Sequence, residues 1–463
     1  MDAGLPDRKS GGRRAMTNTR PLTQDDLKAA AYFAVGVTSE GSIGGHDVSY
    51  RLSFAGNVAG DGRMSPVGNS GYSFGTLQID LGANPAVARD MLDHYQQWAD
   101  GEPDRAALHL TPDAYASTLH ALQRNGRAMR AAEAHDIDRT DINRFLGSDV
   151  GRAFVHGLDR QHAEAITRVD RTVGNHDSAL ERLERTELYR NATDDDQARL
   201  AGILMKLQNQ SGERYTPRLL ERIERHELGS AVDVKAAVDG LLPNQANGNP
   251  DYVQSGADNT LRGIALFNTL RAAERGNPLA IAWNSVTSDP LAGPSHARPA
   301  GTCSAESGLK YDTIRSLFLT PEASQRLVHA LDHGATLAEG DPALHHGRRH
   351  AGFYADGGNF VHWNANGQGV ACIGGHWRSV DPEHLHRAVQ RDGSVDLTLT
   401  ENGRTTTLLH VDRHARTTGP AAREPEPAAH PAPAPMHPDG LGQRRFARLD
   451  RRVRAPHEGD GHP

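Results

Sequence analysis

The stretch GNSGYSFGTLQID, residues 68–80, decides how the first half of this 463-residue chain is interpreted. Its glycines, aromatic residues, glutamine and terminal aspartate make it too irregular for an ordinary helix and too polar for a core strand. Glycines are frequent from Gly41 to Gly82, and short alternating pieces such as VSYRLSF, residues 48–54, lie between them. This pattern predicts loops and a small β-hairpin, and hence a Gly-rich β lobe.

A helix is predicted immediately before this lobe. The segment TQDDLKAAAYFAVGVTSEG starts at Thr23 with a threonine cap and acidic residues, and continues with helix-forming and apolar residues to about Glu40. Glu40 would then lie where an apolar helix gives way to glycine and serine, at the mouth of a cleft. Burial there favours the protonated form of a carboxyl group, which suits a general acid. The alternative is a glutamate at a helix end in solvent.

Helical periodicity dominates the next 150 residues, from about 87 to 235, where apolar residues recur three or four apart. A loop or boundary is expected at 240–260, and one more helix follows it. Beyond a Pro/Gly-rich segment, a helix predicted from Tyr311 to His333 precedes a β-rich region. The chain is therefore expected to be α+β, with a helical lobe around a small β lobe and a second, smaller domain.

The end of the first helix and the opening stretch together resemble a known superfamily. Ser-Glu-Gly-Ser, followed after some 30 residues by Gly-x-x-Gly-x-x-Phe-Gly-x-x-Gln-x-Asp, is similar to the lysozyme superfamily, specifically goose-type lysozymes and bacterial lytic transglycosylases. The resemblance covers residues 25–90 well. KLQNQSG, residues 206–212, resembles the later Ala-Tyr-Asn-Ala-Gly turn of the family only weakly.

The resemblance implies roles for individual residues. Glu40 would be the catalytic acid, and Asp80 would correspond to the aspartate that closes the goose-type motif. Residues of the Phe-Gly-x-x-Gln segment would line the saccharide cleft and bind substrate: Ser73, Phe74, Gly75 and Gln78. No cofactor or metal is implied.

One departure from the family concerns the second carboxylate. Asn69 stands where goose-type enzymes carry an early aspartate, which leaves Asp47, Asp61 or Asp80 as candidates for a base. Glycoside hydrolysis generally uses two carboxyl groups about 5 to 10 Å apart. A lytic transglycosylase needs only one, because a hydroxyl of the substrate attacks, so the sequence leaves both reactions open.

A second constellation lies at GRRHAGFYADGGNFVHWNANGQGV, residues 347–370, which predicts a strand, a tight Asp-Gly-Gly turn and a strand. Cys303 precedes a predicted helix, whose N-terminus would favour a thiolate. With His350 and His362 on the hairpin, this order resembles NlpC-type cysteine peptidases, which cut peptidoglycan stem peptides. The family's Asp-Cys-Ser-Gly is Thr-Cys-Ser-Ala here, so the nucleophile departs from the pattern.

Other interpretations of these residues stay open. The β-rich region is equally an appendage in which Cys303 is inert or bonded to Cys372, with histidines on its surface. Histidines near residue 350 lack the regular spacing of a zinc site. The fragment HDIDRTDIN, residues 135–143, lacks the central glycine and final glutamate of an EF-hand, so calcium is not predicted.

The expected fold class is α+β. A mainly helical lysozyme-like domain is expected at 21–245, a helix and linker at 246–300, and a smaller β-rich α+β domain, which resembles NlpC-type peptidases, at 301–412. Residues 1–20 and the Pro/Arg-rich tail 413–463 are expected to be disordered.

The expected function is cleavage of the peptidoglycan glycan strand between N-acetylmuramic acid and N-acetylglucosamine, with stem-peptide cleavage as an extension. The alternative is a non-catalytic peptidoglycan-binding or secretion-docking protein. A formal net charge of −7 gives no basic field for nucleic acid, and no run of about 18 apolar residues predicts a membrane span. The N-terminus lacks the apolar stretch of a secretory signal, so another route to the wall is expected. The protein would be either an antibacterial effector delivered to a target periplasm, with secretion machinery and an immunity protein as partners, or a lytic enzyme of phage-mediated lysis.

Overall fold

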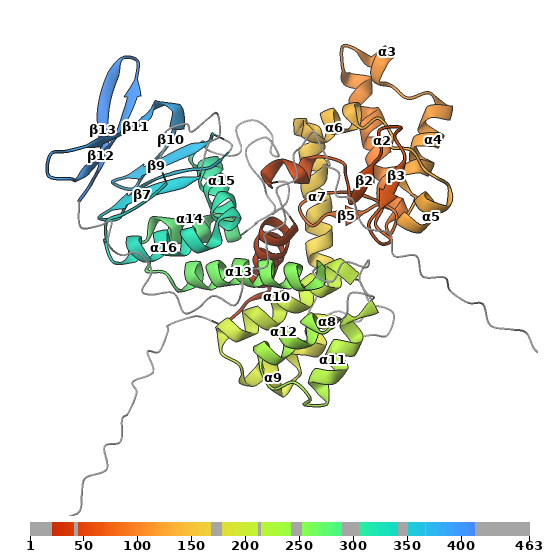
Figure 1. Cartoon of the computed structure of the whole chain (residues 1–463), viewed down its shortest axis with the longest axis horizontal. Helices are drawn as coiled ribbons and strands as arrows, with labels where there is room; N and C mark the ends of the chain where they lie inside the picture. The colour runs from red at the N-terminus through yellow and green to blue at the C-terminus, as the bar shows by residue number, and fades with distance from the viewer. Residues whose placement is uncertain are drawn as a thin grey trace, which may run out of the picture.

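The computed structural model describes residues 21–40, 45–167, 178–211, 214–241, 252–288, 305–340, 351–365 and 367–412. It is a mixed structure of helices and antiparallel sheets (Figure 1). The predicted disordered ends, 1–20 and 413–463, lie outside the described residues. No helix within the described ranges has the length and apolar character needed to cross a membrane.

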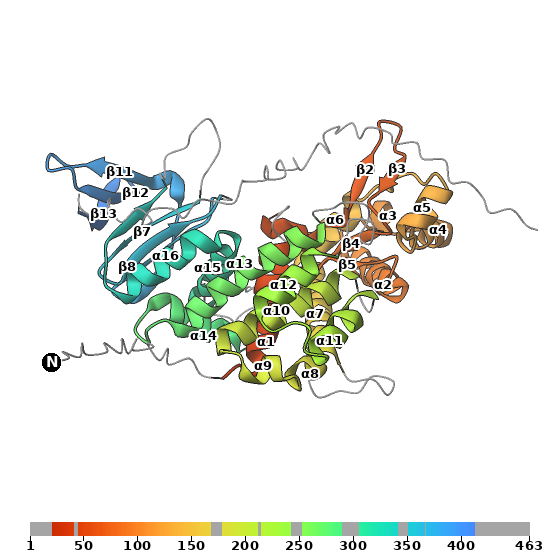
Figure 2. The ribbon, with the colours of Figure 1, turned by 60° about the horizontal axis from the view of Figure 1, so that its bottom comes forward.

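The predicted first helix is confirmed, with its cap and its end. Helix α1 (Gln24–Ala30) starts with a capping box, in which the Thr23 side chain accepts from the backbone N–H of Asp26 and the Asp26 carboxylate accepts from that of Thr23. It continues as a π-helix, η1 (Ala31–Glu40). Every residue of η1 before Glu40 is buried, and all of them except Thr38 and Ser39 lack a polar side chain or, like Tyr32, are largely aromatic, as expected of a helix enclosed on all sides. Figure 2 shows α1 lying between α14 and α10.

The predicted β lobe is also confirmed, although it is small. After the short 3₁₀ helix η2 (Gly45–Tyr50), the strands are β1 (Ser53–Phe54), β2 (Gly56–Val58), β3 (Met64–Pro66), β4 (Tyr72–Phe74) and β5 (Ile79–Asp80). They form a β2–β3 hairpin and a sheet of order β1-β4-β5. The alternating piece at 48–54 is a strand only at its last two residues, since its first three belong to η2.

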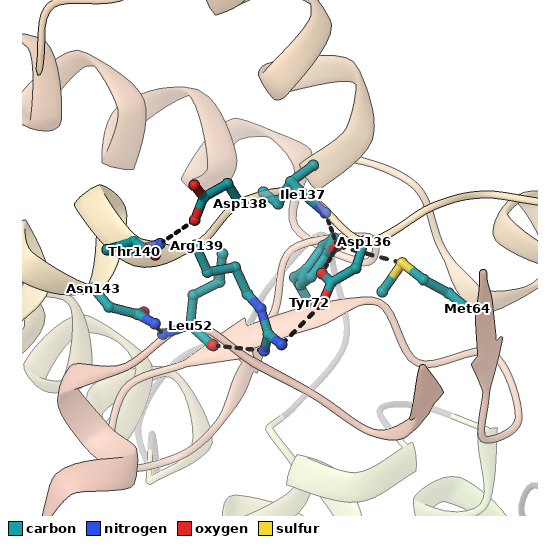
Figure 3. A network of polar contacts seen from close by, with 9 residues as sticks. All are labelled: Leu52, Met64, Tyr72, Asp136, Ile137, Asp138, Arg139, Thr140 and Asn143. Atoms are coloured by element: carbon teal, nitrogen blue, oxygen red, sulfur yellow. Dashed lines mark hydrogen bonds and ion pairs between the residues drawn. The ribbon is translucent and has the colours of Figure 1, made fainter. Parts of the chain in front are cut away.

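The fragment HDIDRTDIN ties this lobe to the helices that cover it (Figure 3). The Tyr72 hydroxyl donates to Asp136 Oδ1 at 2.6 Å, and Arg139 donates to Asp136 Oδ2 at 2.9 Å and to the Leu52 carbonyl at 3.2 Å. Leu52 N–H donates to Asn143 Oδ1 at 2.7 Å. The side chains of Asp136, Arg139 and Asn143 are therefore used in protein contacts. No group of three His, Cys, Asp or Glu suited to a metal ion occurs among the residues that the structure describes.

The helical periodicity predicted between 87 and 235 is confirmed. The helices of this region are α2 (Pro85–Gly101), α3 (Arg105–Leu108), α4 (Pro112–Leu122), α5 (Gly126–Ala131), α6 (Thr140–Gly147), α7 (Asp149–Ile166), α8 (Ala179–Glu184), α9 (Glu187–Asn191), α10 (Asp194–Ser211), α11 (Thr216–Glu224) and α12 (Ala231–Asp239). Helices α2 to α6 surround the β lobe and share a core with it, whereas α7 and α10 run through the centre of the molecule (Figure 1).

Four helices lead into the second half: α13 (Tyr252–Ala272), α14 (Pro278–Thr287), α15 (Ala305–Leu319) and α16 (Pro321–Asp332). A five-stranded antiparallel sheet of order β10-β9-β8-β7-β6 follows, made of β6 (Leu337–Glu339), β7 (Gly352–Asp356), β8 (Asn359–Trp363), β9 (Gly369–Ile373) and β10 (His376–Val380). Beyond the turn η6 (Pro382–His384), β11 (Leu385–Val389), β12 (Val395–Glu401) and β13 (Arg404–Val411) form a separate three-stranded sheet.

The predicted hairpin in this half is confirmed. Strands β7 and β8 pair through Asp356 and Asn359, and the two turn residues, Gly357 and Gly358, have φ values of 55° and 90°. Positive φ at both turn positions is the geometry of a type I′ turn, which glycine adopts without strain.

The main hydrophobic core runs across the two predicted domains. One buried cluster contains Leu27 and Phe33 from the first helix, Trp283 from α14, Phe318 from α15 and Phe360 from β8. The Phe33 and Phe318 rings stack with centroids 5.0 Å apart. Helices α13 to α16 thus complete the packing around the helix that ends at Glu40.

Candidate active site

Glu40 ends the π-helix η1, and two side chains of α10 hold its carboxylate. Lys206 Nζ lies 2.5 Å from Glu40 Oε1, and Asn209 Nδ2 donates to the same oxygen at 2.8 Å. Residues three apart lie on one face of a helix, which explains how Lys206 and Asn209 reach the same carboxylate. The Glu40 side chain keeps 15% of its surface exposed, so solvent or a ligand can reach it.

Lys206 is a buried cation, with 2% of its side chain exposed. Among the described residues, Glu40 is the one carboxylate that forms an ion pair with it. A charge inside a protein is costly unless it is paired. The Glu40 carboxylate therefore offsets the cost of burying the Lys206 ammonium.

The segment Gly75–Gln78 lies directly beside this pair. Asn209 Nδ2 donates to the Leu77 carbonyl at 3.1 Å as well as to Glu40. The turn also touches the helix that carries Glu40, because a Cβ placed on Gly36 would lie 2.7 Å from Thr76 Cγ2. The structure thus brings Glu40, at the end of η1, next to the Phe-Gly-x-x-Gln segment.

Asp159 of α7 fixes the same turn from the other side. Both of its carboxylate oxygens lie 3.0 Å from the backbone N of Thr76. Burial raises the pKa of Asp159 to about 6, against the opposing effect of the Thr76 hydrogen bonds and the Arg315 charge. Gly75 has a φ of 85°, and a Cβ there would lie 2.8 Å from Asp159 Oδ1. Close approach of the carboxylate therefore requires glycine at 75.

His162, one turn further along α7, orients Asn209. Its Nε2 lies 3.1 Å from Asn209 Oδ1, and since the amide nitrogen donates to Glu40 and Leu77, the oxygen accepts and the histidine donates. Burial lowers the pKa of His162, although Asn209 and the Glu40 charge act in the opposite direction. The imidazole is therefore neutral at pH 7 with its proton on Nε2.

The side chain of Gln78, predicted to bind substrate, is used inside the β lobe. Its Oε1 accepts from the hydroxyls of Ser53 at 2.8 Å and Ser73 at 3.1 Å, and its Nε2 donates to the Gly75 carbonyl at 2.9 Å. Phe74 is fully buried. Ser73, Phe74, Gly75 and Gln78 therefore shape the turn through contacts within the protein.

Asp80, the other predicted catalytic carboxylate of this lobe, accepts three backbone hydrogen bonds. Its Oδ2 accepts from Gly71 N–H at 3.0 Å, and its Oδ1 accepts from the N–H groups of Gly82 at 2.8 Å and Ala83 at 3.1 Å. These bonds close the two ends of the GNSGYSFGTLQID segment. Asp61, another candidate, pairs with Arg63 at 2.7 Å.

In the second half, Cys303 and His350 lie outside the described residues. His362 is buried on β8, where its Nε2 lies 3.0 Å from Ser316 Oγ of α15, and burial lowers its pKa to about 4. Ser316 lies about three turns after the first residue of α15, Ala305, which corresponds to about 16 Å along the helix. His362 therefore contacts the fourth turn of α15 through Ser316.

Cys372, the other cysteine, is a buried free thiol on β9. Burial raises its pKa to about 11, so it is protonated at neutral pH. It packs in the main core, opposite Phe360 in the sheet register.

The residues that sequence reasoning missed are Lys206, His162 and Asp159. Lys206 and Asn209 fall in the KLQNQSG segment, whose weak resemblance to a family turn was the one available signal. His162 and Asp159 sit in an ordinary amphipathic helix, and nothing in the local pattern distinguishes them. Their partners lie far away in the sequence, so only the tertiary structure brings them to Glu40 and the turn.

Comparisons of this chain with protein-family models, with curated proteins and with solved structures found no match. The resemblance to the lysozyme superfamily therefore stays a prediction from the two motifs.

Proposed function

We propose that this protein cleaves the glycan strand of bacterial peptidoglycan, with Glu40 as the proton donor to the glycosidic oxygen. One observation carries the proposal: Asn209 bonds both Glu40 Oε1 and the Leu77 carbonyl, so a partly exposed carboxylate lies against the Gly-rich turn. In the superfamily that the motifs resemble, these two elements hold the acid and the saccharide.

Of the candidate second carboxylates, the two whose side chains the structure describes favour the lytic transglycosylase reaction over hydrolysis. Asp80 and Asp61, two candidates for a second carboxylate, are engaged by backbone N–H groups and by Arg63 respectively. A mechanism with one carboxylate does not require them. The muramic acid C6 hydroxyl attacks its own C1 while the bond from C1 to the leaving oxygen breaks, and the product carries a 1,6-anhydro end.

Glu40 would act in both of its protonation states. Protonated Glu40 gives its proton to the leaving oxygen, and the resulting carboxylate then accepts the proton of the attacking hydroxyl. The neutral His162 keeps the Asn209 amide directed at the same carboxylate.

Muropeptide mass spectrometry tests this proposal directly. Purified peptidoglycan treated with the protein should yield 1,6-anhydro muropeptides, and Glu40→Gln should yield at most one per cent of them. Reducing-end products alone would identify hydrolysis and so a second carboxylate. If intact sacculi bind the protein but are never cleaved, it is a glycan-binding protein, and the catalytic proposal is wrong.

A further inference from the structure

We infer that Lys206 is a positioning residue that, with Asn209, immobilises Glu40 Oε1 and leaves Oε2 as the oxygen that exchanges protons with the substrate. The inference rests on the proposed function and identifies the part of the site that orients its acid. Both residues lie in the KLQNQSG segment, whose weak resemblance to a family turn implies no role for either side chain.

The hydrogen bonds to Glu40 are one-sided. Both Lys206 Nζ and Asn209 Nδ2 contact Oε1, and no described residue donates to Oε2. A carboxylate held by two donors at one oxygen cannot rotate freely. Oε2 is therefore presented in one direction, on the side of the group that is not enclosed by α10.

The position of Lys206 is itself enforced by packing. Gly256 of α13 lies so close to α10 that a Cβ at 256 would be 2.4 Å from Gln210 Nε2 and 2.6 Å from Lys206 Cε. Asn209 is likewise held at three points, by Glu40, Leu77 and His162. A lysine held in this way has little freedom to follow Glu40 if the carboxylate moves, which is the property of a fixed support.

Two variants separate positioning from simple folding effects. Lys206→Met removes the ammonium and keeps the length of the side chain. Gly256→Ala keeps the ammonium but crowds both the Lys206 Cε and the Gln210 amide. Lys235→Met is the matched control for the first, because Lys235 also pairs with a carboxylate at 2.5 Å, that of Asp239. Gly157→Ala is the control for the second, since a Cβ at this helical glycine meets nothing within 4 Å.

The assay is release of soluble muropeptides from purified sacculi by the full-length chain, measured over a range of sacculus concentrations. Lys206→Met and Gly256→Ala should each lower kcat at least tenfold, with KM within twofold of the wild-type value. The controls should leave both constants within twofold. The inference is overturned if Lys206→Met keeps kcat within twofold, or if its loss only follows the folded fraction measured by circular dichroism.

If the wild-type protein shows no turnover, the proposed function is wrong, but the Glu40–Lys206 contact can still be tested through stability. The melting temperatures of Glu40→Gln, Lys206→Met and the double variant then show whether the two side chains form a fixed pair. A double variant that melts higher than the two single losses predict supports the fixed pair. Strict additivity of the losses contradicts it.

Discussion

Replacing Glu40 by glutamine should destabilise this protein, although an exposed acid would tolerate the change. The substitution leaves Lys206, with 2% of its side chain exposed, without its carboxylate partner. Breaking a buried ion pair by removing one partner costs about 3 to 5 kcal/mol of unfolding free energy. Because Glu40 is 15% exposed, we expect the lower value, about 3 kcal/mol.

Replacing Lys206 instead of Glu40 should cost less unfolding free energy, because the partner left behind, Glu40, is less buried. In Lys206→Met, Glu40 keeps its contact with solvent and the Asn209 hydrogen bond, so we expect a loss of about 1 kcal/mol. Glu40→Gln/Lys206→Met replaces the pair by two neutral side chains of similar length and should also lose about 1 kcal/mol. The double variant should thus be about 3 kcal/mol more stable than additivity predicts.

Urea unfolding at pH 7, followed by circular dichroism and tryptophan fluorescence, measures the unfolding free energy of the wild type, the two single variants and the double variant, which together form a double-mutant cycle. A loss of about 3 kcal/mol corresponds to a decrease in Tm of about 6 to 12 °C for a unit of 150 to 250 residues. Glu40→Gln within about 1 kcal/mol of the wild type, or additive losses in the double variant, would refute the reasoning. The double variant is also the better inactive control, since its fold should survive where that of Glu40→Gln is weakened.

Three further predictions concern the supports of the site and the core. Asp159 has a pKa of about 6 in the folded protein and about 4 in the unfolded chain, so the native state binds more protons between these pH values. Asp159 therefore lowers the unfolding free energy by about 3 kcal/mol as the pH rises from 4 to 6. Asp159→Asn should lack this contribution, and an unchanged slope of stability against pH in this variant would contradict the prediction. Gly75→Ala should cost at least about 1 kcal/mol of unfolding free energy, because it combines a positive φ with a Cβ 2.8 Å from Asp159 Oδ1, and Gly157→Ala is its control. In a Cys303→Ala background, Cys372 should react with a thiol reagent only in denaturant, because the thiol is buried and protonated; fast labelling of the native protein would disprove this.

Local sequence patterns predicted a good part of the secondary structure. The threonine cap and acidic first turn located the start of the helix that ends at Glu40, and the Asp-Gly-Gly turn located the β7–β8 hairpin. Such features depend on contacts between residues a few positions apart, so they are visible in the sequence. The alternating pattern at 48–54 failed for its first half, because η2 buries Tyr50 and Ser49 through helical rather than strand spacing.

The partners of polar side chains could not be predicted in the same way. Gln78 and Asp80 carry the chemistry of site residues, yet their hydrogen bonds close the β lobe on itself. Hydrogen-bonding capacity is a property of the residue type, but whether neighbouring backbone groups use it depends on the three-dimensional arrangement. The sequence therefore identified the right segment and could not distinguish its structural side chains from exposed ones.

By itself the sequence determined that Glu40 ends a capped, apolar helix and that a Gly-rich turn follows it. Only the tertiary structure decided what meets the carboxylate: Lys206, 166 residues away, and the Asn209 amide that joins it to the turn. The physical reason is that the ion pair depends on burial, which arises when α10 and α13 close around the end of the helix. A lysine in an amphipathic segment is usually solvated, and the packing of a glycine on α13 against its side chain makes this one a fixed, buried cation.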